Sequence, residues 1–173
     1  MIIMMKGNTE YNFIKRTRSL VQQYDCLGLS EADMYDVTLL LNACLGLLVI
    51  IEERYKTYRP KKFKSLDSLK SATTLCLSKN FNPKSKNCKN IFGHLRDSIA
   101  HCHFYISEIV GDKITKICFK NYLNDAEIET EKLFEAVIEV GVLKKALFEY
   151  SKLTIDNYNK QHPKDVDMTD SGE

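Results

Sequence analysis

Hydrophobic positions recur at helical spacing along much of the chain. Over Tyr11–Tyr24 the apolar side chains fall on one face of a helix and most basic side chains on the opposite face. Nearly every position of Asp36–Glu52 is apolar, which predicts a helix buried on most of its sides. A short helix is expected within Ser65–Leu77 and a long one from Thr130 to about Leu153, with Asp125 as an alternative cap.

The second of these stretches must be weighed against a membrane span. Its apolar run, Val37–Ile51, is interrupted by Thr38 and Asn42 and falls short of the roughly 20 residues that a bilayer requires. We therefore expect a helix inside a bundle, or partly inside a subunit interface. Asn42 then needs a hydrogen-bond partner in the core or near an active groove. Gly46 indicates close approach of another helix.

The stretch Ile91–His103 concentrates chemistry in a helical pattern. It contains three of the four histidines of the chain. Phe92, Leu95, Ile99 and Cys102 recur at steps of three and four residues, which predicts one buried stripe along a helix. We refer to this segment as the motif stretch.

Three polar side chains flank that stripe. Asp97 and His101 are four positions apart, so they stand above one another on a helix and can share a hydrogen bond. Arg96 and His101 are five positions apart, roughly 140° around the axis at about 100° per residue. Both could therefore point into a groove formed with another helix.

After the motif stretch the pattern changes to that of strands. Two runs rich in β-branched and aromatic residues, 103–110 and 113–120, are separated by Gly111-Asp112 and predict a β-hairpin. Ile114, Ile117 and Phe119 do not alternate regularly, so the register stays open.

Length and composition favour one mainly helical domain. A chain of 173 residues with three prolines and seven glycines suits helices, and we place the domain at 1–155. The acidic stretch 156–173 is expected to be a disordered tail. No signal peptide is recognisable, and the six cysteines are widely spaced without a Cys-x-x-Cys pair. We therefore expect a reducing cytoplasm, buried thiols and no disulfide framework.

The net charge of +2 conceals a strong asymmetry. The segment Arg54–Asn90 carries eleven lysines and arginines against one aspartate, so the rest of the chain is acidic. Such a run is either a solvated face or an electrostatic footprint for RNA, with Tyr55, Tyr58, Phe63 and Phe81 interleaved as stacking platforms. On the second interpretation the candidate RNA-binding residues are Lys61, Lys62, Lys64, Lys86 and Lys89.

The wording Leu95-Arg-Asp-Ser-Ile-Ala-His101 resembles the arginine–polar–x–x–x–histidine signature of the HEPN superfamily. Asp97 stands where asparagine is more common in that family. The context from about residue 10 to 153 also resembles the family. The resemblance implies a bundle of four or five helices with one β-hairpin after the motif helix.

The resemblance further implies a metal-independent endoribonuclease with Arg96, Asp97 and His101 as catalytic residues and no cofactor. Attack of a 2′-OH on the adjacent phosphate needs a base, an acid and positive charge, which histidine and arginine supply. In the family two motif helices meet in a composite site, so one motif per chain predicts a homodimer. The family also implies a toxin or abortive-infection role, with an antitoxin or regulatory protein as a possible partner.

Other interpretations of the motif stretch stay open. Arg96 and His101 could be satisfied surface side chains, paired with a carboxylate and a backbone carbonyl. A zinc site built from Cys88, Cys102 and the histidines has ligand spacing that matches no finger or ribbon. A non-catalytic RNA-binding or dimerisation module is the main alternative function. The roles of His94 and His103 are undetermined at this stage, although His94 is expected to lie off the active face.

Overall fold

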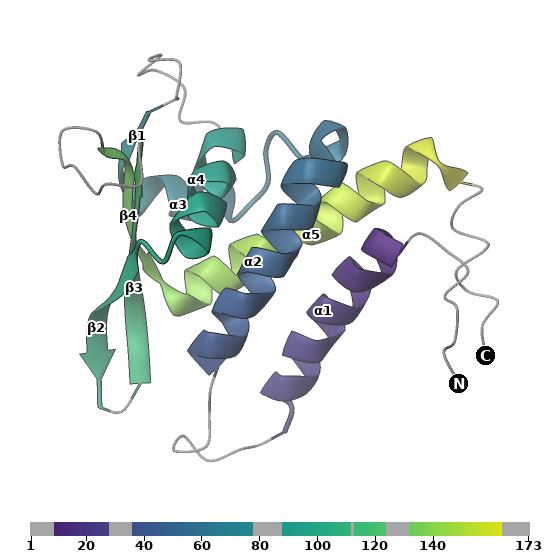
Figure 1. The fold of residues 1–173 in the computed structure, drawn as a ribbon. Helices are drawn as coiled ribbons and strands as arrows, with labels where there is room; N and C mark the ends of the chain where they lie inside the picture. The colour runs from purple at the N-terminus through teal and green to yellow at the C-terminus, as the bar shows by residue number, and fades with distance from the viewer. Residues whose placement is uncertain (1–8, 28–35, 78–87, 112, 124–131, 164–173) are drawn as a thin grey trace.

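The computed structural model describes residues 9–27, 36–77, 88–111, 113–123 and 132–163. These residues form five α-helices, one short 3₁₀-helix and four strands (Figure 1). In chain order the elements are α1 (Thr9–Asp25), α2 (Asp36–Arg54), η2 (Lys56–Tyr58), α3 (Leu66–Ser71), β1 (Thr73–Cys76), α4 (Cys88–Ala100), β2 (Phe104–Val110), β3 (Lys113–Tyr122), β4 (Lys132–Glu139) and α5 (Val140–Gln161). The class, mainly α with some β, agrees with the sequence prediction.

The four strands form one antiparallel sheet in the order β1-β4-β3-β2. The predicted hairpin is confirmed as β2 and β3, in which Phe104 pairs with Phe119. Gly111 follows β2 with φ of +62°, a conformation that glycine adopts without steric cost. The hairpin is therefore half of a larger sheet rather than an isolated appendage of the helices.

The helices stack on one face of the sheet in successive layers (Figure 1). Helix α4 packs against β3, α2 packs against α4, and α1 packs against α2. Helix α5 crosses behind them and contacts both β3 and β4. The core between these layers includes Leu47, Leu48, Phe92, Leu95, Phe119, Phe134 and Tyr150, all fully buried. Within the described residues, no helix is both long enough and apolar enough to cross a bilayer.

Two of the predicted helices include residues that form strands in the structure, so both predictions were partly wrong. The helix expected within Ser65–Leu77 ends at Ser71, and Thr73–Cys76 form β1. The long helix begins at Val140 rather than Thr130, because Lys132–Glu139 form β4. In β4, Phe134, Ala136 and Ile138 point into the core at every second position. Apolar residues at 133, 134, 137 and 138 also satisfy a helical period, so the pattern alone misassigned this segment.

The predictions for α1 and α2 fared better, with one exception. Both helices are present, and a Cβ added to Gly46 would lie 3.1 Å from the ring of Phe13, which confirms the close approach of α1. Asn42, in contrast, is exposed, so the predicted core hydrogen bond is wrong. Helices α1, α4 and α5 cover α2 within one chain, which accounts for most of its apolar composition.

The C-terminal helix ends later than expected. Helix α5 continues to Gln161, and Ile155 is buried in the core, so ordered chain extends past the predicted start of the tail. The residues after 163 lie outside the described part of the chain. The division into a domain and an acidic tail therefore stays a prediction.

Candidate functional site

Helix α4 is fixed in place by its apolar stripe. Phe92, Leu95 and Ile99 are buried as the spacing predicted, and Ile91 is buried beside them. The ring of Phe92 stacks on that of Tyr150 of α5, with centroids 4.0 Å apart. Burial of such side chains stabilises by about 1.5–3 kcal/mol each, so the helix that carries the motif is a rigid part of the core.

The helix ends earlier than the motif stretch suggested. Cys102 adopts φ of +58°, its amide bonds to the carbonyl of Ile99, and the amide of His103 bonds to the carbonyl of Ser98. This pair of hydrogen bonds is the Schellman arrangement that closes helices, in which glycine is the usual residue at the left-handed position. Cys102 is exposed, so its predicted place in the buried stripe is wrong. His101 lies at the helix end, held by a hydrogen bond from its amide to the carbonyl of Asp97 (3.0 Å).

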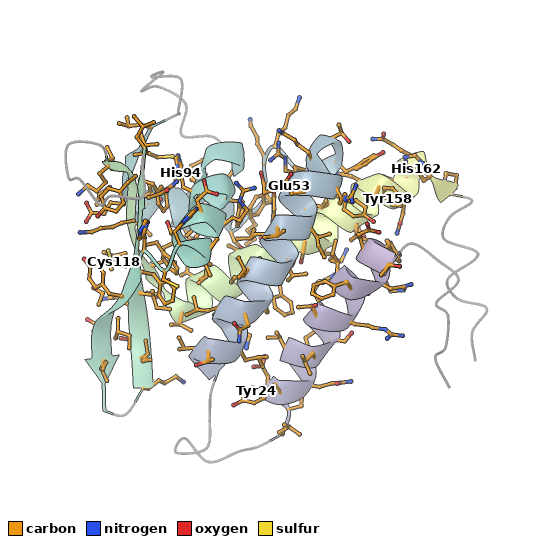
Figure 2. The ribbon with its side chains drawn as sticks, viewed as in Figure 1. Tyr24, Glu53, His94, Cys118, Tyr158 and His162 are labelled. Atoms are coloured by element: carbon orange, nitrogen blue, oxygen red, sulfur yellow. The ribbon has the colours of Figure 1, made fainter. Side chains whose placement is uncertain are left out.

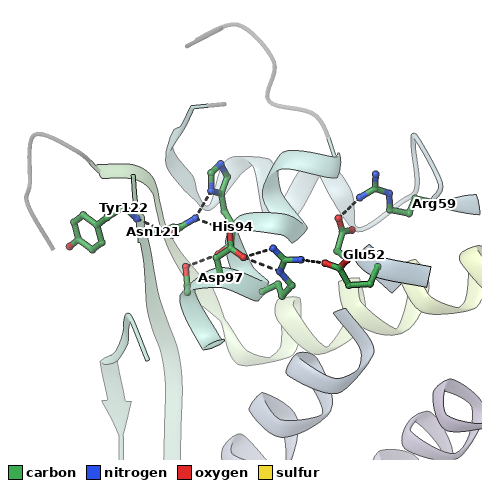
Figure 3. A network of polar contacts seen from close by, with 9 residues as sticks. Glu52, Arg59, His94, Asp97, Asn121 and Tyr122 are labelled. Carbon is green, nitrogen blue, oxygen red and sulfur yellow. Dashed lines mark hydrogen bonds and ion pairs between the residues drawn. The ribbon is translucent and has the colours of Figure 1, made fainter. Parts of the chain in front are cut away.

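Two carboxylates from different elements bind Arg96, and one of them belongs to Asp97, which Figure 3 labels. Its Nε and Nη2 donate to Oδ1 of Asp97 at 2.9 and 2.6 Å, and Nη1 donates to Oε1 of Glu53 at 2.7 Å. Glu53 belongs to α2, which runs beside α4 (Figure 2). Partial burial by itself would lower the pKa of Arg96, but the bond to Asp97 and the charges of Asp97, Glu53 and Glu52 raise it above its usual value. The guanidinium is therefore firmly charged and 27% exposed.

Behind Asp97 lies a buried polar chain. The amide of Asn121 on β3 donates to Nδ1 of His94 (2.9 Å) and lies 3.4 Å from Oδ2 of Asp97. His94 Nε2 is 2.7 Å from the carbonyl of Leu77, so that nitrogen carries the proton and the ring is the neutral tautomer. His94 is 5% exposed, which agrees with its predicted position off the active face.

Two members of this network were not identified from the sequence. Glu53 and Asn121 lie far from the motif along the chain, and only the packing of α2 and β3 against α4 brings them to it. Asn121 gave one faint signal, a polar residue within an otherwise apolar strand. Glu53 gave none, since it follows another glutamate at the end of a mostly apolar helix.

His101 has a different environment. It is exposed, and its ring lies 5.8 Å from that of His103, nearly parallel. The ring of His103 in turn meets Tyr122 of β3 edge-on at 5.4 Å. The contacts described for Arg96 are with Asp97 and with Glu53 of α2, whereas the ring contact described for His101 is with His103, just before β2. The hydrogen bond predicted between the side chains of Asp97 and His101 stays a prediction.

The basic segment is only partly available for binding. Lys61, Lys62 and Lys64 are exposed, and the ring of Phe63 between them stacks on Phe92 of α4 at 5.9 Å. These three lysines therefore lie on a segment anchored beside the motif helix. Lys86 is outside the described residues, as is the side chain of Lys89 at the start of α4.

The aromatic residues of that segment do not form an open stacking surface. Tyr55 is buried, and Tyr58 packs edge-on against Tyr158 of α5 at 5.2 Å. Arg59 is also buried and pairs with Glu52, which accepts a further hydrogen bond from the hydroxyl of Tyr150 (2.7 Å). The proposed aromatic platforms are thus wrong for Tyr55, Tyr58 and Phe63, whereas Phe81 lies outside the described residues.

A metal centre receives no geometric support from this part of the chain. Among the described residues, no three histidine, cysteine, aspartate or glutamate side chains converge as metal ligands would. His94, one of the ligands considered for zinc, engages both ring nitrogens in hydrogen bonds within the core.

Comparison with known proteins adds one finding. The model of one protein family, described as HEPN pEK499 p136, matches residues 4–161. That range contains every described helix and strand, including the motif helix and the hairpin. Only residues 162 and 163 of the described part of the chain lie beyond it. No curated protein and no solved structure matches the chain.

Proposed function

The chain belongs to the HEPN family, and on that premise we propose that it is a metal-independent endoribonuclease. The observation that carries the proposal is the arrangement on α4 of a charged, partly exposed Arg96, held by Asp97, and an exposed His101 at the helix end. Histidine and arginine can supply the proton transfer and the positive charge that cleavage of RNA without a metal requires.

In the proposed reaction the 2′-hydroxyl oxygen forms a bond to the adjacent phosphorus, and the bond from phosphorus to the 5′-oxygen breaks. A base removes the hydroxyl proton and an acid protonates the leaving oxygen, so the products are a 2′,3′-cyclic phosphate and a 5′-hydroxyl. His101 is the proton-transfer residue, since imidazole exchanges protons near neutral pH. Arg96 stabilises the extra negative charge on the phosphate by two parallel hydrogen bonds.

A phosphate that binds Arg96 competes with the two carboxylates already paired with it. Asp97 binds the Nε and Nη2 edge and is itself supported by Asn121, whereas Glu53 binds Nη1 alone. The side chain of Glu53 is 63% exposed and that of Asp97 is 14% exposed. The phosphate therefore replaces Glu53, while Asp97 keeps the guanidinium oriented.

One chain supplies one proton-transfer histidine, whereas the reaction uses a base and an acid. We therefore propose that the active enzyme is a homodimer in which the ends of two α4 helices meet and share one cleft. The apolar composition of α2, accounted for within one chain, lends this proposal no support. The dimer proposal rests on the need for a second proton-transfer group, which a second chain supplies.

The RNA strand is proposed to run along Lys61, Lys62 and Lys64. Each bound phosphate releases counterions, so replacing all three lysines with glutamine should weaken RNA binding. For single-stranded RNA, the slope of log affinity against log salt concentration should become less steep by about 2. The matched control replaces Lys144, Lys145 and Lys152 of α5, which makes the same change in charge elsewhere. Equal salt slopes for the two triple variants would assign the basic run to an ordinary solvated face.

The biological role that fits this activity is a toxin or abortive-infection effector acting on cytoplasmic RNA and restrained by an antitoxin or another regulator. Induced expression of the wild-type chain should then stop growth, and the His101→Ala chain should be tolerated. Equal growth arrest by both chains would contradict this role.

A non-catalytic RNA-binding or dimerisation module is the second candidate. The double pairing of Arg96 favours it, because a guanidinium satisfied by two carboxylates can serve structure alone. Such a module would bind RNA without cutting it.

The experiment that separates the two candidates is cleavage of a defined RNA in EDTA with analysis of the product ends. The wild-type protein should produce 2′,3′-cyclic phosphate and 5′-hydroxyl ends in EDTA as well as in magnesium. His101→Ala should lower the rate about 10²–10⁴-fold, the usual value of a proton-transfer group.

The control for that experiment is His162→Ala, which removes a histidine at the end of α5 that bonds to Tyr58. It should cleave at the wild-type rate. Wild-type cleavage by His101→Ala would overturn the assignment, and a 5′-phosphate product would indicate an activated water instead of the 2′-hydroxyl.

A further inference from the structure

Beside His101, the start of β2 and the end of β3 enclose a cavity of about 200 Å³. Its lining consists of Cys102, His103, Phe104, Tyr105, Lys120 and Tyr122. We propose that this cavity is the subsite for the nucleobase next to the phosphate that is cleaved. The inference rests on the proposed ribonuclease function and extends it to recognition of the substrate.

The topology of the hairpin gathers these side chains. Successive residues of a strand point to opposite faces of the sheet. Phe119 and Asn121 of β3 point toward the helices, where Phe119 is fully buried and Asn121 meets His94. Lys120 therefore takes the other face, and Tyr122, which follows an irregularity in the pairing of β3 with β4, lines the cavity together with it. The amide of Lys120 donates to the carbonyl of His103 (2.9 Å), which fixes the first residues of the hairpin beside its last.

The lining has the chemistry that binds a base. Tyr122 is 8% exposed and forms part of the floor, with the ring of His103 edge-on against it. Tyr105 is 51% exposed at the rim, and Nζ of Lys120 lies 5.5 Å from the centre of its ring. Aromatic rings accept any base by stacking, and a nearby cation attracts the phosphate that accompanies the base.

The charge of Lys120 is only loosely paired within the described part of the chain. There its ion pair is with Oε1 of Glu135 at 3.8 Å, which is long for such a contact. Glu135 also accepts a hydrogen bond from Nζ of Lys132 at 2.7 Å, so its charge is shared between two lysines. Lys120 thus contributes a positive charge to the described lining of the cavity, as suits a nucleotide site.

The size and position of the cavity also suit a nucleobase. Pockets for drug-sized ligands usually occupy about 300–1,000 Å³, so this one suits a single ring system better than a larger molecule. It shares His103 with the ring pair of His101 and His103, so a base held here brings its own ribose and phosphate to His101. The same cavity therefore positions the 2′-hydroxyl beside the proposed proton-transfer side chain.

The test uses a short RNA that cannot be cut, with 2′-O-methyl groups and one 2-aminopurine base, and a second strand that is abasic at that position. The wild-type protein should quench the fluorescence of the base and prefer the base-containing strand. Loss of a stacking ring should reduce that preference about 5- to 100-fold. The variants are His103→Ala and Tyr105→Ala, since truncating the buried Tyr122 would disturb folding.

The matched control is Ile109→Ala, which removes an exposed apolar side chain from the far end of the same strand. It should bind both strands as the wild-type protein does. Unchanged preference for the base-containing strand in both His103→Ala and Tyr105→Ala would overturn the subsite. A change of oligomeric state in Tyr105→Ala with base preference intact would likewise overturn it, and would assign the rim to a protein contact.

Cleavage of unmodified RNA, measured in parallel, separates this inference from the proposed function. A wild-type protein that cuts RNA but shows no base preference refutes the subsite alone. A wild-type protein that binds the base but never cuts RNA refutes the nuclease and leaves the base-binding site supported.

Discussion

Arg96 and His101 stand on the same helix, yet the structure holds them in different ways. Arg96 is fixed by three hydrogen bonds to two carboxylates, one of which is supported by Asn121 and, through it, by His94. His101 is exposed at the last turn, and its position depends on the backbone bonds that close the helix. The hydrogen bonds therefore fix the orientation of the Arg96 guanidinium, whereas the exposed position of His101 leaves its ring accessible to a substrate.

This difference suits the two roles. A phosphate-binding fork works best when its geometry is set before the substrate arrives, because no reorganisation is then required in the transition state. A proton-transfer side chain must reach the hydroxyl or the leaving oxygen at hydrogen-bond distance, which an exposed helix end allows. The comparison predicts that changes to Arg96 act through geometry and that changes to its supports act in a graded way.

The largest effect is expected at Arg96 itself. Arg96→Ala should reduce cleavage about as much as loss of the histidine, and Arg96→Lys should not restore full activity, because an ammonium cannot make two parallel bonds to a phosphate. Cleavage rates of both variants at saturating RNA test this. Full activity of Arg96→Lys would show that only positive charge matters and would remove geometry from the comparison.

A smaller effect on cleavage is expected at Asn121, which supports Asp97, the partner of Arg96. Asn121→Ala leaves Nδ1 of the buried His94 without its donor and should cost about 1–3 kcal/mol of stability. It should also lower cleavage, by up to about 10²-fold if Asp97 and Arg96 shift by an ångström. Urea unfolding and cleavage rates are measured together.

Asn157→Ala is the control for that variant, since it removes a side-chain amide that donates to the carbonyl of Tyr58 at 2.9 Å, away from the motif. It should lose stability while keeping its activity. Equal losses of activity in the two variants would mean that Asn121 acts only through the general stability of the fold.

The smallest effect, with the opposite sign, is expected at Glu53. Glu53→Gln keeps the shape of the side chain but removes the charge that competes with phosphate for Nη1 of Arg96. RNA should bind a few-fold more tightly, and stability should change by less than about 1 kcal/mol because the pair is largely exposed. Asp67→Asn removes the same charge at an exposed site on α3 and serves as the control. Equal gains in affinity for the two variants would reduce the effect to net charge.

The parts of this picture that the sequence predicted are those encoded by near neighbours. The stripe Phe92, Leu95 and Ile99 identified α4, and two β-branched runs around Gly111 identified the hairpin, because each pattern lies within a few residues. The motif wording supplied the family, which the match over residues 4–161 confirmed.

The parts that the sequence did not predict depend on distant partners. Lys132–Glu139 form a strand because β1 and β3 pair with this segment on its two sides. The local sequence does not reveal those partners. Glu53 and Asn121 joined the site for the same reason. The early end of α4 was missed because Cys102 occupies a left-handed position for which cysteine has no intrinsic preference.

The central claim is that Arg96 and His101 of two chains form one shared active site. Purified heterodimers, formed by co-expression of two differently tagged chains, test it most directly. One chain is wild type and the other carries both Arg96→Ala and His101→Ala. A shared site retains one arginine and one histidine, so the account predicts that RNA cleavage falls far below half of the wild-type rate. Cleavage at half of the wild-type rate would show that each chain works alone and would contradict the account.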